Sequence, residues 1–429
     1  MKKVAIYTLG CKVNQYESDA MYMMFKKNNY DMVDFEEQAD IYVINTCTVT
    51  GTGDKKSRQI IRRARRKNPE ALVVVTGCLA QVWDKEGVEL PEVNLIVGNQ
   101  DRKNIIEIIE KYEGETVKEI SDIMKQRDFW EAGKVLSRER TRAYVKIQDG
   151  CDRFCSYCII PYARGPVRSR DLESIKREVN NLVENGFKEI VLTGIHIASY
   201  GKDLRTMTLI DVLKELDKIE GLERIRLGSI EPNFITEESV EIMKSMKKLC
   251  KHFHLSLQSG NNDTLKRMNR RYSVDEFEEK VNLLRQAFEN PALTTDIIVG
   301  FPGETEEEFK NTYEFLKRIE FSRMHVFPYS KRVGTPAAIM ENQIPENIKS
   351  ERVKLLTEMS VRNERAFAKK FIGQEIDVIF EHELKNNSEI YEGYTDRYVK
   401  VLAKGVGLGK SEKVIANGID EETMALLCE

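Results

Sequence analysis

Three cysteines, Cys151, Cys155 and Cys158, stand in the spacing C-x3-C-x2-C. Three thiolates this close together can bind three corners of a 4Fe–4S cluster, which normally takes four cysteine ligands. The next cysteine along the chain is Cys250, so one iron would be open to a ligand that is not protein. An open metal position is typical of a reactive site, whereas a closed one is usually structural. A structural zinc site is the alternative, but zinc ribbons normally use paired C-x2-C knuckles.

A second group of three cysteines is spread along the first fifth of the chain. Cys11, Cys47 and Cys78 each follow a short apolar run with strand character, and each stands near Gly or Asn. In a parallel sheet the C-terminal ends of the strands open on one edge, so these distant residues would meet in one cleft. A neighbouring glycine lets the backbone approach a bulky inorganic group. A lone cysteine after a strand is usually a small buried hydrophobe, but three at equivalent points predict a second open-site cluster.

The elements that must position the second group alternate between strand and helix, which predicts a parallel α/β sheet. Strands are expected at 4–9, 41–45, 72–76 and 94–97, with helices at 17–27, 55–67 and 104–112. Residues 113–140 are charged and lack sustained periodicity, which is typical of a linker.

The first group lies at the start of another alternation, from about residue 141 to residue 368. Its expected strands are 144–147, 189–192, 224–227, 252–257, 295–299 and 324–326. Six such units predict a partial (βα)6 barrel, in which chemistry gathers at the C-terminal ends of the strands. Cys151 to Cys158 follow the first of these strands. From about residue 371 the pattern changes to short strands at 375–380, 391–395, 398–403 and 413–416, which predict a small β-barrel.

The composition is that of a soluble globular protein, with 41% hydrophobic and 32% charged residues. The sequence has no apolar run of 18 residues, and its N-terminus enters a strand pattern without a signal-peptide segment. Eight cysteines in a large chain without a secretion signal favour metal sites in a reducing compartment. We therefore expect a cytoplasmic protein.

The helix expected at 55–67 carries a concentrated positive charge, including Arg62, Arg63 and Arg66. Ile60, Ile61 and Ala64 could form its apolar stripe, leaving an almost wholly cationic opposite face. Such a face can bind a polyanion such as RNA. The alternative is a solvated helix surface with no ligand.

Several motifs in the same order resemble those of the methylthiotransferases, a family of radical S-adenosylmethionine (SAM) enzymes, and the resemblance covers essentially the whole chain. They are the runs 8–18, 45–49, 76–78, 150–170, 255–260 and 296–304. The resemblance implies an α/β chain with a parallel-sheet N-terminal cluster domain (1–115), a linker (116–140), a radical SAM barrel (141–368) and an OB-like all-β TRAM domain (369–429).

Branches of the family differ in the first motif and near the third barrel strand. The run 10–17 (Gly-Cys-Lys-Val-Asn-Gln-Tyr-Glu) and the run 228–232 (Gly-Ser-Ile-Glu-Pro) are similar to the branch acting on N6-threonylcarbamoyladenosine in tRNA. The isopentenyladenosine branch tends to carry Gln-Met-Asn after the first cysteine, and the ribosomal-protein aspartate branch Pro-Lys-Asn. Those two substrates are the alternatives within the same chemistry. A non-enzymatic iron–sulfur or zinc RNA-binding module is a more distant one.

The resemblance also implies the cofactors and partners. Cys151, Cys155 and Cys158 would hold a 4Fe–4S cluster whose open iron chelates SAM, and reduction would yield a 5′-deoxyadenosyl radical. Cys11, Cys47 and Cys78 would hold an auxiliary 4Fe–4S cluster that carries the sulfur or methylthio group. One SAM would methylate the sulfur, and another would supply the radical. The implied partners are tRNA, an electron donor such as flavodoxin or ferredoxin, and a sulfur source.

Further residues are candidate SAM contacts because they stand inside the cysteine motif, after strands or in a basic run. They are Tyr157, Thr193, Gly194, Ser229, Glu231, Gln258 and Arg271. Core packing is the alternative for Tyr157, and a structural strand-end role is the alternative for the others. Thr193-Gly194 stands where many radical SAM enzymes have Gly-Gly-Glu.

A TRAM domain implies tRNA binding by the C-terminal barrel, but from Phe371 onward there are six Lys or Arg against twelve Asp or Glu. Phosphate contacts dominate nucleic-acid affinity and need cations. We therefore expect the attraction to come from Arg62, Arg63 and Arg66, from Arg164, Arg168 and Arg170, and from the run 266–271.

Overall fold

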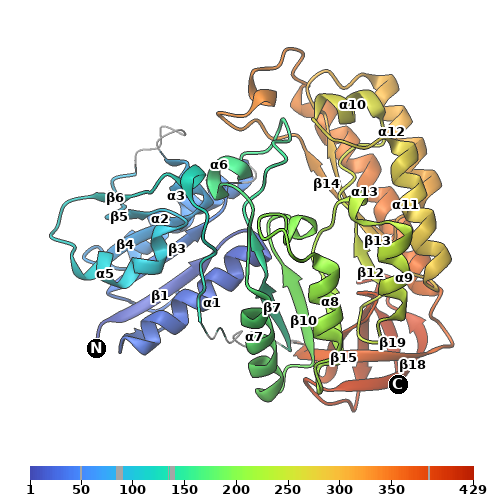
Figure 1. Cartoon of the computed structure of the whole chain (residues 1–429), viewed down its shortest axis with the longest axis horizontal. Helices are drawn as coiled ribbons and strands as arrows, with labels where there is room; N and C mark the ends of the chain where they lie inside the picture. The colour runs from blue at the N-terminus through green and yellow to red at the C-terminus, as the bar shows by residue number, and fades with distance from the viewer. Residues whose placement is uncertain (49–50, 84–89, 134, 136–140, 385–386) are drawn as a thin grey trace.

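The computed structural model describes residues 1–48, 51–83, 90–133, 135, 141–384 and 387–429. Val49 of the second cysteine motif and part of the predicted linker lie outside these residues. Figure 1 shows the N-terminal domain in blue beside a central barrel in green to orange, with a red β-barrel at the base of the latter. The predicted fold class is confirmed.

The N-terminal domain is a six-stranded parallel sheet in the order β2-β1-β3-β4-β5-β6. Its elements are β1 (Lys3–Thr8), α1 (Lys12–Lys27), β2 (Asp31–Met32), β3 (Ile41–Thr46), α2 (Gly51–Lys67), β4 (Leu72–Gly77), α3 (Cys78–Gln81), β5 (Leu95–Val97), α5 (Ile105–Glu110) and β6 (Val117–Glu119). β3 is buried along its whole length, which its apolar sequence requires between two helix layers.

The first sheet continues past residue 115, where the sequence predicts the start of a linker. β6 pairs in parallel with β5 through Val117 and Leu95. This edge strand is only three residues long and largely exposed, so it carries no apolar run that would mark it in the sequence.

The central domain contains two three-stranded parallel sheets, in the orders β11-β10-β7 and β12-β13-β14. Their strands are β7 (Arg142–Lys146), β10 (Glu189–Thr193), β11 (Arg224–Leu227), β12 (His252–His254), β13 (Ala292–Val299) and β14 (Arg323–Pro328). Single bridges from Ile225 to Leu249 and from Ile230 to Leu255 join the two sheets into a partial barrel. A short hairpin of β8 (Gln148–Asp149) and β9 (Arg168–Ser169) follows the first strand.

Most helices of this domain pack outside the strands (Figure 1). They are α7 (Leu172–Glu184), α8 (Leu209–Asp217), α9 (Glu237–Ser245), α10 (Asn262–Arg267), α11 (Val274–Ala287), α12 (Glu306–Ile319) and α13 (Glu346–Lys369). The short α6 (Ile160–Arg164) packs instead beside α3 of the N-terminal domain. Thr305 and Glu308 form a reciprocal capping box that starts α12 and satisfies two otherwise unpaired amides.

The C-terminal domain is a closed barrel in the order β15-β16-β17-β19-β18. Its strands are β15 (Glu375–Leu384), β16 (Asn387–Thr395), β17 (Lys400–Lys404), β18 (Ser411–Ile419) and β19 (Leu426–Cys428). Sequence patterning misses β19, which pairs in parallel with β17 and antiparallel with β18 and so closes the barrel. Three residues are too few for a periodicity signal.

Arginines at the base of the central barrel hold the C-terminal domain. Arg224 donates to the carbonyl oxygen of Tyr394 at 2.9 Å, and Arg226 donates to that of Thr395 at 3.1 Å. The Arg226 guanidinium also lies 4.5 Å from the ring centroid of Tyr398. The C-terminal barrel is therefore fixed beneath the strands and contributes Tyr398 to their interior.

No helix among the described residues has the length and apolar character needed to cross a bilayer.

Candidate active site

The contiguous cysteine group lies on a loop between the two strands of the β8–β9 hairpin. Gly150 has φ +74°, and a Cβ at that position would lie 1.8 Å from the carbonyl oxygen of Pro166, so only glycine fits. The amide of Cys151 donates to Gly165 O at 2.9 Å, and that of Cys158 donates to Cys155 O at 2.9 Å. These bonds close the loop and hold its three cysteines within a few residues of one another.

The chemistry of the thiols in this loop is compatible with binding a metal cluster. Burial raises the pKa of Cys151 to about 11 and that of Cys158 to about 12. Without a metal both thiols are therefore protonated at neutral pH, and a cationic centre is needed to hold them as thiolates. Arg270 Nη1 lies 3.3 Å from Cys155 Sγ and donates to it.

The scattered cysteine group is brought to one sheet edge, as the sequence predicts. Cys11, Cys47 and Cys78 follow β1, β3 and β4, which are neighbours in the sheet. The backbones pack closely, because a Cβ on Gly10 would lie 2.8 Å from the Cβ of Cys47. The Asn14 side-chain amide links the chain after β1 to the end of β3, because it donates to Leu9 O at 2.8 Å and to Thr46 O at 2.9 Å.

The two cysteine groups are connected by Arg164, the last residue of α6. This helix begins two residues after Cys158, and Arg164 Nε donates to Cys78 Sγ at 3.3 Å. The side chain of Arg164 is fully buried and also pairs with Glu17 at 2.6 Å. Glu17 pairs in turn with Lys146 at 2.7 Å, so a buried ion network fixes the N-terminal domain on the barrel.

The burial of Arg164, Arg168 and Arg170 corrects the prediction that they contact RNA. Each is at most 2% exposed. Arg168 lies 3.5 Å from Asp149, and Arg170 bonds to Glu178. These arginines neutralise buried carboxylates at the interface between domains, which a charge count along the sequence cannot distinguish from a surface patch.

Several predicted SAM contacts line two cavities that share part of their walls. The larger, of about 610 Å³, has Thr193, Gly194 and Ser229 in its wall. The smaller, of about 290 Å³, has Tyr157 and Gln258 in its wall. Asp296 borders both cavities. The structure therefore separates the predicted contacts into two subsets, one on each side of Asp296.

Glu231 is surrounded by cationic protein groups. Its carboxylate lies 2.8 Å from Arg153, 3.1 Å from His196 and 3.3 Å from Arg270. Burial alone would raise the pKa of Glu231, but these three neighbours lower it to about 2. The carboxylate is thus ionised, and its own protein partners already satisfy it.

Arg271 is exposed and lines neither of these two cavities, so its predicted contact with SAM stays a prediction without support from the cavity walls. The neighbouring Arg270 points inward instead, with a side chain that is 6% exposed. Arg270 and Arg271 are both basic, so the sequence does not show which of them faces the site. The path of the backbone after α10 decides this.

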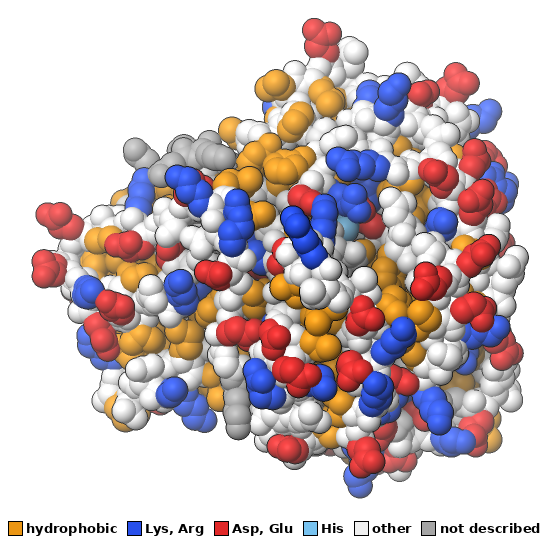
Figure 2. All heavy atoms as spheres, viewed as in Figure 1, with side chains coloured by type: hydrophobic (Ala, Val, Ile, Leu, Met, Phe, Trp, Pro, Cys, Tyr) orange, Lys and Arg blue, Asp and Glu red, His pale blue; other side chains and the backbone are white. Residues whose placement is uncertain are grey.

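The basic helix is confirmed as α2, with Ile60, Ile61 and Ala64 buried. Arg62 and Arg66 are exposed, while Arg62 also lies 3.5 Å from Glu92 and Arg63 pairs with Glu36. Figure 2 shows Lys and Arg side chains gathered where the N-terminal domain faces the barrel. Arg62 and Arg66 of α2 are open to solvent, which keeps this helix a candidate RNA contact.

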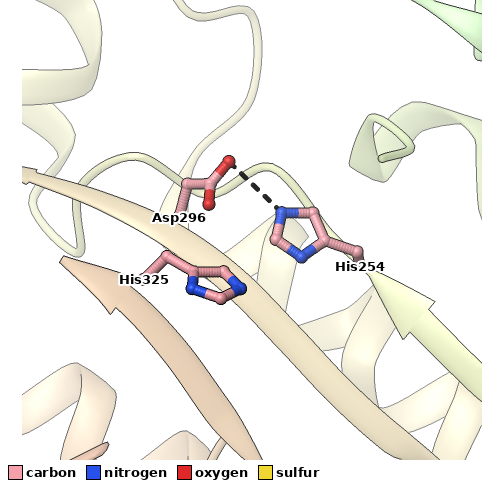
Figure 3. A group of neighbouring side chains, drawn as sticks. All are labelled: His254, Asp296 and His325. Carbon is pink, nitrogen blue, oxygen red and sulfur yellow. Dashed lines mark ion pairs between the residues drawn. The ribbon is translucent and has the colours of Figure 1, made fainter. Parts of the chain in front are cut away.

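Histidines whose sequence spacing shows no metal-ligand pattern come together inside the larger cavity. His254, Asp296 and His325 stand on β12, β13 and β14, and their polar atoms lie within 4.8 Å of one another (Figure 3). His254 Nε2 is 3.3 Å from the Asp296 carboxylate. Burial, followed by repulsion from Arg226, lowers the pKa of nearby His252.

The larger cavity lies where all three domains meet. Its walls include Cys11 and Lys12 of the N-terminal domain, Ser229 of the barrel and Tyr398 of the C-terminal barrel. One cysteine of the scattered group therefore opens into the same space as predicted SAM contacts.

Comparison with known proteins identifies the family. A model of the Radical SAM superfamily matches residues 145–316, and a model described as Uncharacterized protein family UPF0004 matches residues 3–98. The threonylcarbamoyladenosine tRNA methylthiotransferase MtaB of Bacillus subtilis is 48% identical, over 96% of this chain and 93% of that protein. This chain belongs to the radical SAM methylthiotransferase family.

Other relatives of this methylthiotransferase share less. The tRNA-2-methylthio-N6-dimethylallyladenosine synthase of Clostridium tetani is 37% identical, over 94% of this chain and 91% of that protein. The radical SAM methyltransferase TsrM of Kitasatospora setae has the same fold, with a TM-score of 0.58 at 16% identity over 79% of this chain and 77% of that chain. Membership of the superfamily implies SAM and a 4Fe–4S cluster as cofactors.

Proposed function

We propose that this methylthiotransferase acts on tRNA, adding a methylthio group at C2 of N6-threonylcarbamoyladenosine at position 37, beside the anticodon. The relative with 48% identity is named for this nucleoside, whereas the relative named for dimethylallyladenosine is 37% identical. The observation that carries the proposal is the shared cavity, whose wall contains Cys11 together with Thr193, Gly194 and Ser229. A substrate in that cavity would lie between the predicted sulfur-carrying site and the predicted SAM site.

The 4Fe–4S cluster is assigned to Cys151, Cys155 and Cys158, and a second cluster to Cys11, Cys47 and Cys78. When bound, these groups with SAM supply the radical that removes the C2 hydrogen and the sulfur that replaces it. Gly10 leaves room for Cys47, because a Cβ at Gly10 would lie 3.0 Å from the Cys47 sulfur, and Gly150 allows the close turn that begins the contiguous cysteine loop. Arg164 and Arg270 each donate to one cysteine sulfur and so favour thiolates.

The polar residues of the barrel position the substrates. Thr193 and Ser229 offer hydroxyl groups to the larger cavity, while Tyr157 and Gln258 would hold SAM in the smaller one. Glu231, held by Arg153, Arg270 and His196, would fix the loop beside the cysteine motif rather than contact SAM.

Two further partners and the domain division belong to the proposal. Reduction of the SAM-binding cluster requires an electron donor such as flavodoxin or ferredoxin, and repeated turnover requires a sulfur source. The functional units are the cluster domain 1–115, extended by β6, a linker to residue 140, the barrel 141–368 and the TRAM domain 369–429.

Nucleoside mass spectrometry of tRNA from cells lacking this protein tests the substrate. We expect loss of the methylthio group from threonylcarbamoyladenosine, with the dimethylallyl product retained. Expression of the intact chain in those cells should restore the product. Persistence of the methylthio-threonylcarbamoyl product in the deletion strain would refute the proposal.

A further inference from the structure

The larger cavity is rich in positive charge. Lys12, Arg323 and Arg397 line it together with three histidines, while Asp296 and Glu364 are the acidic residues of its described wall. The three strand-borne histidines and the three cations come from all three domains. An excess of cations around a cavity is the electrostatic complement of an anion.

Most of these charges already have protein partners. Asp296 lies 3.3 Å from His254, and Glu364 lies 3.5 Å from Arg323. Arg397 donates to the carbonyl oxygens of Asn290 and Glu289. Lys12 forms no ion pair within the part of the chain that the structure describes, although it stands next to Cys11 and borders the cavity. The Arg323 side chain is 52% exposed, so it has room for a second partner.

We propose that this cavity binds the threonylcarbamoyl arm of the substrate nucleoside, with Lys12 and Arg323 pairing its carboxylate. The inference rests on the proposed function and names the residues that select the substrate. The arm carries one carboxylate and one hydroxyl group, whereas a dimethylallyl arm carries neither. A carboxylate leaves water only where cations replace its hydration, and a cationic wall is equally unfavourable for an apolar arm.

The three side chains of Figure 3 bind the hydroxyl group of the same threonylcarbamoyl arm. His254 and His325 present ring nitrogens beside Asp296, and Thr294 Oγ1 lies 3.0 Å from His254 Nδ1. This arrangement offers donors and acceptors to a hydroxyl group. A divalent metal ion is the other occupant that two histidines and a carboxylate can hold, but Lys12 and Arg323 in the same wall would repel it.

Binding to three anticodon stem-loop RNAs tests the assignment, with threonylcarbamoyladenosine, dimethylallyladenosine or unmodified adenosine at the target position. The measured quantity is the ratio of dissociation constants for the reconstituted holoenzyme at fixed salt. We expect the wild type to favour the threonylcarbamoyl RNA over the dimethylallyl RNA by about tenfold or more, because charged hydrogen bonds contribute at this level. Lys12→Met and Arg323→Gln should each lose most of that preference.

Matched variants separate charge from other effects. Lys12→Arg retains the charge and should keep most of the preference, and Lys103→Met, an exposed lysine of the same domain, should leave it unchanged. Iron per chain is measured for every variant, because Lys12 neighbours Cys11. If Lys12→Met loses iron, the assignment is judged from Arg323→Gln, because Arg323 stands on β14 and does not neighbour a cysteine in the sequence.

The outcomes are distinguishable. A wild-type preference that survives both Lys12→Met and Arg323→Gln would overturn this inference and leave the proposed function intact. A preference that requires added divalent ion and disappears with His254→Ala alone would identify a metal site instead. A wild type without preference for the threonylcarbamoyl RNA would refute the proposed substrate itself.

Discussion

The two cysteine groups of this methylthiotransferase are built in opposite ways. Cys151, Cys155 and Cys158 lie on one loop whose shape is set by its own backbone bonds and by the β8–β9 hairpin. Cys11, Cys47 and Cys78 come from three strands and meet only because β1, β3 and β4 are neighbours. The first group depends on local geometry, and the second depends on the sheet and on the interface between domains.

The difference has a consequence for what each group can tolerate. The contiguous group uses Gly150 and a short turn, so a change far away in the sheet should leave it formed. The scattered group is held by Asn14 and by Arg164, which reaches it from the barrel. A fault in the domain interface should therefore impair the scattered group first.

Removal of each cysteine group gives the largest expected effect. The triple variant Cys151→Ala, Cys155→Ala, Cys158→Ala should abolish cleavage of SAM to 5′-deoxyadenosine. The triple variant Cys11→Ala, Cys47→Ala, Cys78→Ala should retain cleavage but form no methylthio product. Each should lower iron from about eight to about four per chain, because each cluster holds four. Iron analysis and chromatography of SAM products measure both effects.

Cys250→Ala is the matched control, because Cys250 is buried but belongs to neither group. It should retain full iron and both activities. Unchanged iron in either triple variant would show that the corresponding site is wrongly assigned.

Acid should weaken the interface beneath the scattered group. Burial would raise the pKa of Glu17, but Arg102, Arg164 and Lys146 outweigh it and lower that pKa from 4.5 to about 2. The stabilisation is therefore complete above about pH 4.5 and is lost as the pH falls toward 2. Glu17→Gln should lower the thermal unfolding midpoint at pH 7, since it leaves buried cations without their counter-charge.

The informative quantity is the difference in thermal unfolding midpoint between the wild type and Glu17→Gln. It should be widest near pH 7 and narrow below about pH 4.5, because Glu17 of the unfolded protein then binds a proton while the folded-state pKa is about 2. Glu107→Gln, an exposed carboxylate of α5, should show no such difference. A difference that stays constant between pH 7 and pH 3 would contradict the role assigned to Glu17.

Charge reversal on α2 should give the smallest effect. It extends the comparison of the two cysteine-bearing domains by testing which of them attracts RNA. Arg62→Glu with Arg66→Glu should weaken tRNA binding by about tenfold at moderate salt. It should also reduce the dependence of log affinity on log salt by nearly one per lost phosphate contact. Arg177→Glu, exposed on α7, is the control on the barrel. Equal affinity of the α2 variant and wild type across salt concentrations would exclude this helix as an RNA contact.

Much of the fold follows from sequence patterning. The strands after which Cys11, Cys47 and Cys78 stand are predicted within a residue or two, because buried parallel strands are continuous apolar runs. The edge strand β6 and the closing strand β19 are missed, since three residues carry no periodicity.

The direction in which charged side chains point is beyond sequence reasoning. Arg164, Arg168 and Arg170 read as an RNA-binding patch, yet each is buried against a carboxylate from elsewhere in the chain. Arg270 and Arg271 differ by one position, and only the former faces the cysteine loop. The partners of Arg164 and Arg270, Glu17 and Cys155, lie more than a hundred residues away along the chain and leave no local signal.

The sequence alone indicates both cysteine groups and the order of the three domains, because ligand type, ligand spacing and strand periodicity are local properties of the chain. The radical chemistry is implied by the resemblance of its motifs to those of the methylthiotransferases. The tertiary structure decides which surfaces face each other. It places Cys11, Lys12, Ser229 and Tyr398 in the wall of one cavity and brings His254, Asp296 and His325 together from three strands. A cavity is defined by contacts between distant segments, so its shape and its charge exist only in the folded protein.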